Sequence, residues 1–168
     1  MRKTTALIVG GSGMLAEFCR EIAGGYAHIG VIGRTKSKMQ NVNAIPNLVP
    51  IYTDYNNLEA LKRELADFVG TYGKPNLTVA WVHTSAQGAV QLIAQFCEDK
   101  FYEVAGSSGA QKSHISHKHE GSIKSLGLEY HRIVLGSINN RWLTDPEISQ
   151  GVLAALSDKS TQHIIGEI

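Results

Sequence analysis

The sequence predicts a doubly wound α/β domain, with three layers and a mostly parallel sheet of six or seven strands between the helices. Apolar runs of strand length recur along the 168 residues, and they are continuous rather than alternating, which indicates strands buried on both faces. Segments with helical spacing separate these runs, so that strand and helix alternate five times. This alternation favours parallel strands joined by right-handed crossovers, and the length fits a single domain over residues 1–168.

Each expected element follows from its own pattern. The expected strands cover residues 6–9, 30–32, 48–52, 77–82, 101–105 and 130–135. The expected helices cover residues 14–23, 57–69 and 87–98, and in each of them the apolar residues share one face. In the first helix this face consists of Leu15, Phe18, Cys19 and Ile22. These faces would pack on the sheet.

A capping box begins one more helix near the C-terminus. Thr144 supplies the N-cap hydroxyl, Glu147 follows three residues later, and Pro146 lies in the first turn, where its missing N–H costs little. We therefore expect a helix over residues 146–156. The stretch 107–127, rich in Ser, Gly, His and Lys, is expected to be a long loop or an irregular crossover, of a length that is often functional.

Composition argues against several classes of partner. Lysine and arginine number 16 against 15 aspartates and glutamates, and no long basic run exists to follow a nucleic acid. No stretch approaches the roughly 20 apolar residues that span a bilayer, and the first apolar run, about six residues, is too short for a signal peptide. Cys19 and Cys97 lie in apolar helical patterns typical of small buried thiols. We expect a cytoplasmic protein without nucleic-acid or membrane partners.

A glycine-rich turn joins the first expected strand to the first expected helix. Gly11, Gly13 and Ala16 fit the pattern G-x-G-x-x-G/A in the strand–turn–helix context that this dinucleotide-binding fingerprint requires. Gly11 allows a tight turn, Gly13 lets a pyrophosphate approach the backbone, and Ala16 keeps the helix close to the strand. The N–H groups expected to be free for the phosphates are those of Ser12, Gly13, Met14 and Leu15. The alternative is a tight turn without a ligand.

The end of the second expected strand, VIGRTKSK, indicates which dinucleotide is bound. NAD-binding turns place an acidic residue here to bond the ribose 2′-hydroxyl, whereas an arginine suits a 2′-phosphate. Arg34 occupies this position, followed by Thr35 and two lysines. Because a guanidinium binds phosphate in a fork, the sequence favours NADP over NAD. The alternative is an exposed basic start to a helix.

With GGSGMLAE, VIGRT and YTDYNN in that order, the chain resembles the short-chain dehydrogenase/reductase superfamily, and more its small or atypical members. The resemblance covers residues 4–140 in element order, and its specific motifs lie within the first 60 residues. It implies an NAD(P)-binding Rossmann fold with Asp54 and Tyr55 beside the adenine. The family's Asn-Ala-Gly segment near the ribose corresponds to His83, Thr84 and Ser85. For His83, a hydrogen-bonded histidine at a strand end is the alternative.

The resemblance also implies where catalysis would take place. Ser107 and Ser108 match the position where the family commonly places its catalytic serine, and residues 135–138 match the segment that flanks the nicotinamide. Arg141 and Trp142 precede the last helix and could close over the cofactor. For Trp142, the alternative is that it packs against that helix.

One departure from the family bears directly on catalysis. Its enzymes carry Tyr-x-x-x-Lys, in which the lysine lowers the tyrosine pKa for proton transfer. None of the six tyrosines here has a lysine four residues later, so the usual relay is absent. Lys112 or a histidine of the HISHKHE stretch is one alternative donor. The stretch contributes His114, His117 and His119, whose spacing fits no metal motif, so flexible exposed histidines are the other interpretation.

Three functions remain open, and with them whether the chain is an enzyme. The first is an NADP-dependent oxidoreductase acting on a carbonyl-type small molecule with a non-standard proton donor. The second is a catalytically silent NADP(H)-binding sensor or partner-binding protein. The third is an α/β protein that uses the same turn for another phosphorylated ligand. The sequence leaves the oligomeric state undecided, with a homodimer among the alternatives.

Overall fold

The computed structural model describes residues 3–10, 13–83, 86, 88–106 and 119–168. Seven strands form one sheet in the order β3-β2-β1-β4-β5-β6-β9, and every neighbouring pair is parallel. The strands are β1 (Lys3–Val9), β2 (Tyr26–Gly33), β3 (Leu48–Tyr52), β4 (Leu77–Trp81), β5 (Lys100–Gly106), β6 (Glu129–Leu135) and β9 (Gln162–Ile165). All six expected strands are present, and the doubly wound α/β fold is confirmed.

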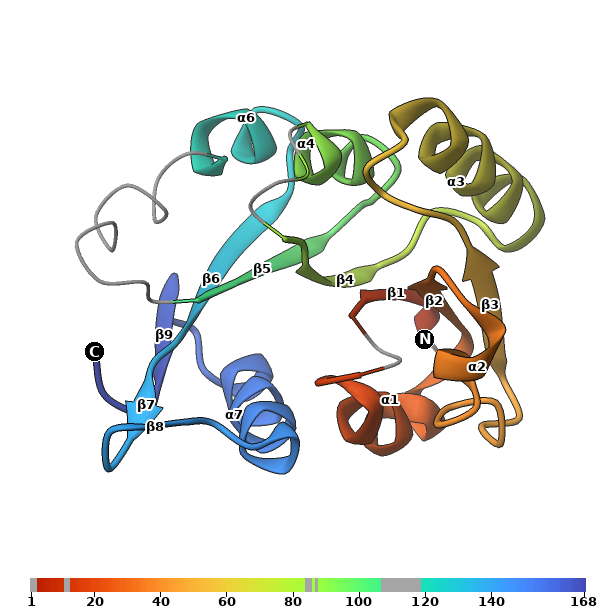
Figure 1. The fold of residues 1–168 in the computed structure, drawn as a ribbon. Helices are drawn as coiled ribbons and strands as arrows, with labels where there is room; N and C mark the ends of the chain where they lie inside the picture. The colour runs from red at the N-terminus through yellow and green to blue at the C-terminus, as the bar shows by residue number, and fades with distance from the viewer. Residues whose placement is uncertain (1–2, 11–12, 84–85, 87, 107–118) are drawn as a thin grey trace.

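Helices cover both faces of the sheet (Figure 1). One face carries α1 (Ala16–Ile22), the 3-10 turn η1 (Ala23–Gly25), α2 (Lys36–Met39) and α7 (Asp145–Ser157). The other carries α3 (Leu58–Tyr72), α4 (Ala89–Ala94) and α6 (Glu120–Lys124). Buried apolar residues accordingly form two clusters, one under each layer of helices.

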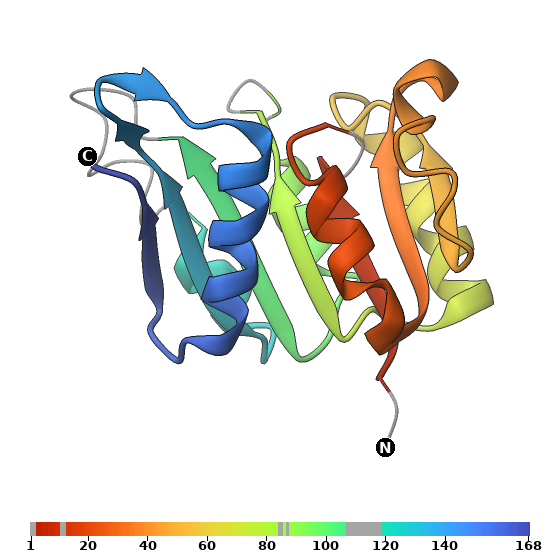
Figure 2. The same cartoon turned by 90° about the horizontal axis from the view of Figure 1, so that it is seen from below.

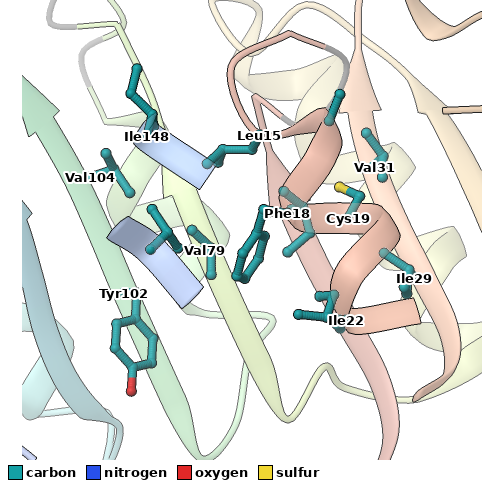
Figure 3. Close-up of a cluster of buried hydrophobic side chains, with 14 of the residues drawn as sticks. Leu15, Phe18, Cys19, Ile22, Ile29, Val31, Val79, Tyr102, Val104 and Ile148 are labelled. Carbon is teal, nitrogen blue, oxygen red and sulfur yellow. The ribbon is translucent and has the colours of Figure 1, made fainter. Parts of the chain in front are cut away.

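The cluster under α1 and α7 packs these helices onto the sheet. Phe18 of α1 is fully buried, and the side chains around it come from five elements (Figure 3). They are Leu15, Cys19 and Ile22 beside it, Ile29 and Val31 of β2, Val79 of β4, Tyr102 and Val104 of β5, and Ile148 of α7. The predicted apolar face of the first helix is therefore confirmed as core.

On the opposite face, Gly30 of β2 sets how closely α3 approaches the sheet. A Cβ atom at this position would lie 2.6 Å from Cζ of Phe68, closer than packed atoms come. The ring of Phe68 thus packs directly on the backbone of β2, which explains a glycine inside a buried strand.

The helix boundaries differ from the sequence expectations at several points. The first helix begins at Ala16 rather than at residue 14, because a hydrogen-bonded turn precedes it. The helix expected over 87–98 is shorter, Ala89–Ala94, and the chain turns through Asp99 at φ 68°. The stretch expected as an irregular crossover contains α6, while residues 107–118 lie outside the described residues.

Both cysteines are buried and free of disulfides, as the sequence predicts. Burial raises the pKa of each thiol to about 12. The Cys97 thiol donates to the carbonyl oxygen of Ile93 (3.1 Å) and accepts from the Thr78 hydroxyl (3.0 Å). Within the described ranges, no helix has the length and apolar character needed to cross a membrane.

Candidate functional site

The strand order reverses between β1 and β4, and in open α/β sheets such a reversal marks the ligand crevice at the carboxyl ends of the strands. From β1 the chain proceeds outward to β2 and β3 on one side, and from β4 outward to β9 on the other. All seven strands point to the same edge of the sheet (Figure 2). In open α/β sheets, ligands bind at this edge where the strand order reverses.

The turn between β1 and α1 is organised by Gly10. Its φ of 92° lies in the left-handed region, and its carbonyl oxygen accepts from the N–H groups of Gly13 and Leu15 (both 3.2 Å). These two amides are therefore engaged within the turn, where the sequence predicted free N–H groups. The fingerprint places the tight turn at Gly11, which with Ser12 lies outside the described residues.

Open space lies beside Gly13, as the fingerprint requires. A Cβ atom built there would meet nothing within 4 Å. The Met14 amide has no hydrogen-bond partner within the part of the chain that the structure describes, whereas the Leu15 side chain is fully buried in the core. The turn thus has open space at Gly13 and an unbonded amide at Met14, and Leu15 anchors it in the core.

Ser149 fixes this turn from the far end of the chain. Its hydroxyl accepts from the N–H of Phe18 (3.1 Å) and donates to the carbonyl oxygen of Met14 (3.0 Å). Ser149 is fully buried on α7, which lies beside α1 (Figure 2). Ser149 could not be predicted from the sequence, because a partner 131 positions away leaves no local pattern.

The ends of β2 and β3 bring Arg34 and Asp54 together. Arg34 is exposed directly after β2, and Thr35 is the N-cap of α2. Hydrogen bonds from the backbone and side-chain amides of Asn56 (both 3.0 Å) hold the pKa of the Asp54 carboxyl below its usual value. The positive charge of Arg34 lowers this pKa further, so the two side chains share the same corner of the crevice.

Tyr55 connects this corner to the end of β4. Its hydroxyl oxygen accepts a hydrogen bond from the backbone N–H of His83 (3.2 Å). The structure therefore brings together two residues that the sequence predicted for one site, although they are 28 positions apart. Thr84 and Ser85, predicted beside them, lie outside the described residues.

Two indoles lie along the same edge. A Cβ atom on Gly10 would be 3.1 Å from Cβ and 3.3 Å from Cδ1 of Trp81, so this side chain runs close against the glycine turn. Trp142 is 52% exposed, so about half of its surface is left uncovered. No role was predicted for Trp81, because a tryptophan inside an apolar run does not differ from a core residue.

Near β5 and β6, three polar side chains form a buried group. The Tyr130 hydroxyl donates to one oxygen of Glu103 (2.7 Å), and Nδ1 of His119 lies 2.7 Å from the other. Burial and the Glu103 carboxylate raise the pKa of Tyr130, the opposite of what a proton-donating tyrosine needs. His119 is thus paired and mostly buried, not a flexible exposed histidine. Ser107, Ser108, Lys112, His114 and His117 lie outside the described residues.

No group of three metal-ligating side chains occurs within the described ranges. A hollow of about 450 Å³ lies between α7 and β9 at the outer edge of the sheet. Its ionisable side chains are Asp158 and His163, which pair with each other (3.4 Å). β9 lies three strands from β4 and four from β1, so this hollow is separate from the crevice.

Comparison with known proteins identifies the fold more narrowly. The order of strands defines the class of α/β domains with a doubly wound parallel sheet. Within this class, the chain has the Rossmann fold of the short-chain dehydrogenases/reductases. No family model matches the sequence, and no curated protein matches it.

Three solved structures illustrate the likeness. A short chain dehydrogenase from Burkholderia cenocepacia J2315, in complex with NADP, has a TM-score of 0.75 and 14% identity over 97% of this chain and 88% of that chain. A betaketoacyl-ACP reductase from Bacteroides thetaiotaomicron has a TM-score of 0.70 and 15% identity over 99% and 95%. A metagenomic short-chain oxidoreductase in complex with NADP has a TM-score of 0.64 and 13% identity over 98% and 95%.

Proposed function

We propose that the protein binds NADP(H) in the crevice at the carboxyl ends of β1 and β4. The observation that carries the proposal is the placement of Arg34 at the tip of β2, beside a turn with open space at Gly13. A diphosphate would lie against the backbone of Gly13 and Met14, near the positive end of the α1 dipole. The two structural neighbours that hold NADP share this fold and support the assignment.

Arg34 would select NADP over NAD. A guanidinium forms a fork that matches a phosphate group, and Arg34 is exposed at the point where the adenosine ribose would lie. Thr35, Asp54 and Tyr55 complete this end of the site, and His83 is joined to it through its hydrogen bond to Tyr55. The Asp54 carboxylate repels the negative charge of a 2′-phosphate, so the preference for NADP depends on the positive charge of Arg34.

The reaction we propose is hydride transfer between the nicotinamide cofactor and a carbonyl-type small molecule. The bound cofactor would supply or accept the hydride. Ser107 and Ser108, beyond the end of β5, would orient the carbonyl. The proton would come from a group other than Tyr130, whose hydroxyl is committed to Glu103.

A titration of the purified protein with NADPH and with NADH, followed by nicotinamide fluorescence, tests the cofactor assignment. We expect NADPH to bind more tightly, and Arg34→Ala to weaken NADPH binding by about 1.5–3 kcal/mol, the value of a hydrogen bond to a charged group. The affinity for NADH should change little. Arg63→Ala is the matched control, because the Arg63 side chain is 68% exposed on α3.

Equal affinity for the two cofactors, or an Arg34→Ala variant that binds NADPH as the wild type does, would contradict the role of Arg34. Binding of neither cofactor would remove the dinucleotide site altogether and favour another phosphorylated ligand.

A second candidate is a silent NADP(H)-binding protein that senses the NADP pool or supports a partner. The specific observation in its favour is the pairing of Tyr130 with Glu103, together with the missing Tyr-x-x-x-Lys. NADPH consumption with a panel of carbonyls and quinones distinguishes the two: turnover favours the oxidoreductase, and binding without turnover favours the silent protein.

A further inference from the structure

The two tryptophans of the chain meet at the carboxyl edge of the sheet. Trp81 ends β4, and Trp142 belongs to β8 (Arg141–Trp142). A Cβ atom built on Gly106, the last residue of β5, would lie 3.6 Å from Cη2 of Trp81 and 3.8 Å from Cη2 of Trp142. The far ends of both indoles therefore lie over the same glycine.

The exposure of these rings indicates a contact surface. Trp142 is 52% exposed and Trp81 is half-buried. An indole gains most when its faces are covered, and it offers a broad flat surface at little cost in conformational entropy. A pair of indoles at the edge where ligands bind thus suits a flat ring that enters from solvent.

The position of Trp142 is set by the fold rather than by a free loop. The hairpin of β7 (Ser137–Ile138) and β8 turns through Asn139 and Asn140, whose φ values of 51° and 61° fit a two-residue turn of type I′. Backbone hydrogen bonds join Ser137 to Glu167 in both directions (2.8 and 2.7 Å).

A salt bridge fastens the same hairpin to α7. Nη2 of Arg141 lies 2.8 Å from Oε1 of Glu147, in the first turn of that helix. Thr144, the N-cap of the helix, donates its hydroxyl to the same Glu147 oxygen (3.0 Å). The hairpin is thereby held at both its ends, and Trp142 stays above β5.

The proposed dinucleotide site, on which this inference rests, determines which ring reaches the indoles. Arg34 at β2 would bind the adenosine end, and the turn after β1 would bind the diphosphate. The remaining half of the dinucleotide then extends past β4 toward β5, where the indoles lie. We infer that Trp81 and Trp142 contact the nicotinamide ring of bound NADP and favour its oxidised form.

The preference for the oxidised form follows from charge. The face of an indole is electron-rich and attracts a cation above it. The oxidised nicotinamide carries a positive charge on the ring, whereas the reduced ring is neutral. Contact with the indoles therefore stabilises bound NADP⁺ more than bound NADPH.

Intrinsic tryptophan fluorescence tests the inference directly, because both tryptophans lie at the proposed contact. The probes are NADP⁺, NADPH and 2′,5′-ADP, a fragment that carries the 2′-phosphate but no nicotinamide. We expect NADP⁺ to quench the indole emission. We expect 2′,5′-ADP to compete with NADP⁺ for binding. It should leave the emission unchanged, because it lacks the half of the dinucleotide that would extend past β4 to the indoles.

Variants at Trp142 provide the second readout. We expect Trp142→Ala to weaken NADP⁺ binding about tenfold and NADPH binding less, with the affinity for 2′,5′-ADP unchanged. Trp142→Phe keeps a ring, restores part of the NADP⁺ affinity and leaves Trp81 as the single reporter. Leu126→Ala is the matched control, because Leu126 is 50% exposed and precedes β6 at the opposite edge of the sheet.

The outcomes separate this inference from the proposed function. Unchanged NADP⁺ affinity in Trp142→Ala, or equal quenching by 2′,5′-ADP and NADP⁺, overturns the role of the indoles while the dinucleotide site stands. Failure of the wild-type protein to bind any of the three probes overturns both.

Discussion

Three single residues shape the proposed site: Arg34 by its charge, Gly10 by its left-handed φ, and Ser149 by its two buried hydrogen bonds. Arg34 follows directly after the second apolar run, and this position alone suggested its role. Gly10 did not stand out, because the sequence has adjacent glycines and the pattern was matched to Gly11, while the left-handed φ belongs to Gly10. Ser149 could not be found, since its two partners, Phe18 and Met14, are far away in the chain.

Ser149 yields a prediction at this scale. In Ser149→Ala the buried N–H of Phe18 loses its acceptor, and an unsatisfied buried donor costs about 1–3 kcal/mol. We expect urea denaturation to show this loss in the free energy of unfolding, together with weaker NADPH binding because the turn loses its support. Ser157→Ala, on the exposed side of the same helix, should stay within about 0.5 kcal/mol of the wild type. An unfolding free energy for Ser149→Ala equal to that of the control would show that the bond contributes nothing.

At the scale of elements, the existence of strands was predictable and the buried polar network was not. Six strands follow from continuous apolar runs, because a strand covered on both faces must be apolar along its length. Residues of β5 and β6 break this rule: Glu103 and Arg132 are 7% and 5% exposed. They are tolerated because Glu103 accepts from Tyr130 and Arg132 pairs with Glu120 (3.4 Å), partners that no periodicity shows.

Tyr102 of β5 gives a prediction for alkaline solution. Burial, with the negative charge of Glu129 as the next cause, raises the pKa of Tyr102 to about 12, whereas an unfolded tyrosine titrates near 10. Between these values the folded protein holds a proton that the unfolded chain releases. The contribution of Tyr102 to the free energy of unfolding is therefore fully present below a pH of about 10. It is lost as the pH rises toward 12, by at most about 1.4 kcal/mol per pH unit.

The variant Tyr102→Phe separates this effect from other titrations. We expect its free energy of unfolding to fall less steeply above pH of about 10 than that of the wild type. Tyr52→Phe, at a 37% exposed position of β3, should keep the wild-type slope. Equal slopes in Tyr102→Phe and the wild type would mean that Tyr102 ionises alike in the folded and unfolded chain.

The whole molecule unites these features through its strand order. Because β1 lies beside β4 at the centre of the sheet, the glycine turn, Arg34 and Trp81 reach one edge although they are far apart in the sequence. Alternation of strands and helices predicted this order in general form. The hairpin of β7 and β8 was not predicted, since two-residue strands carry no periodicity, and it brings Trp142 to the same edge.

A crystal structure of the protein grown with saturating NADP would show whether this edge of the sheet binds NADP as proposed. We expect the diphosphate against Gly13 and Met14, the 2′-phosphate within hydrogen-bond distance of Arg34, and the nicotinamide ring beside Trp81 and Trp142. NADP bound elsewhere, for example in the hollow between α7 and β9, or a crevice without NADP at saturation, would contradict the proposal.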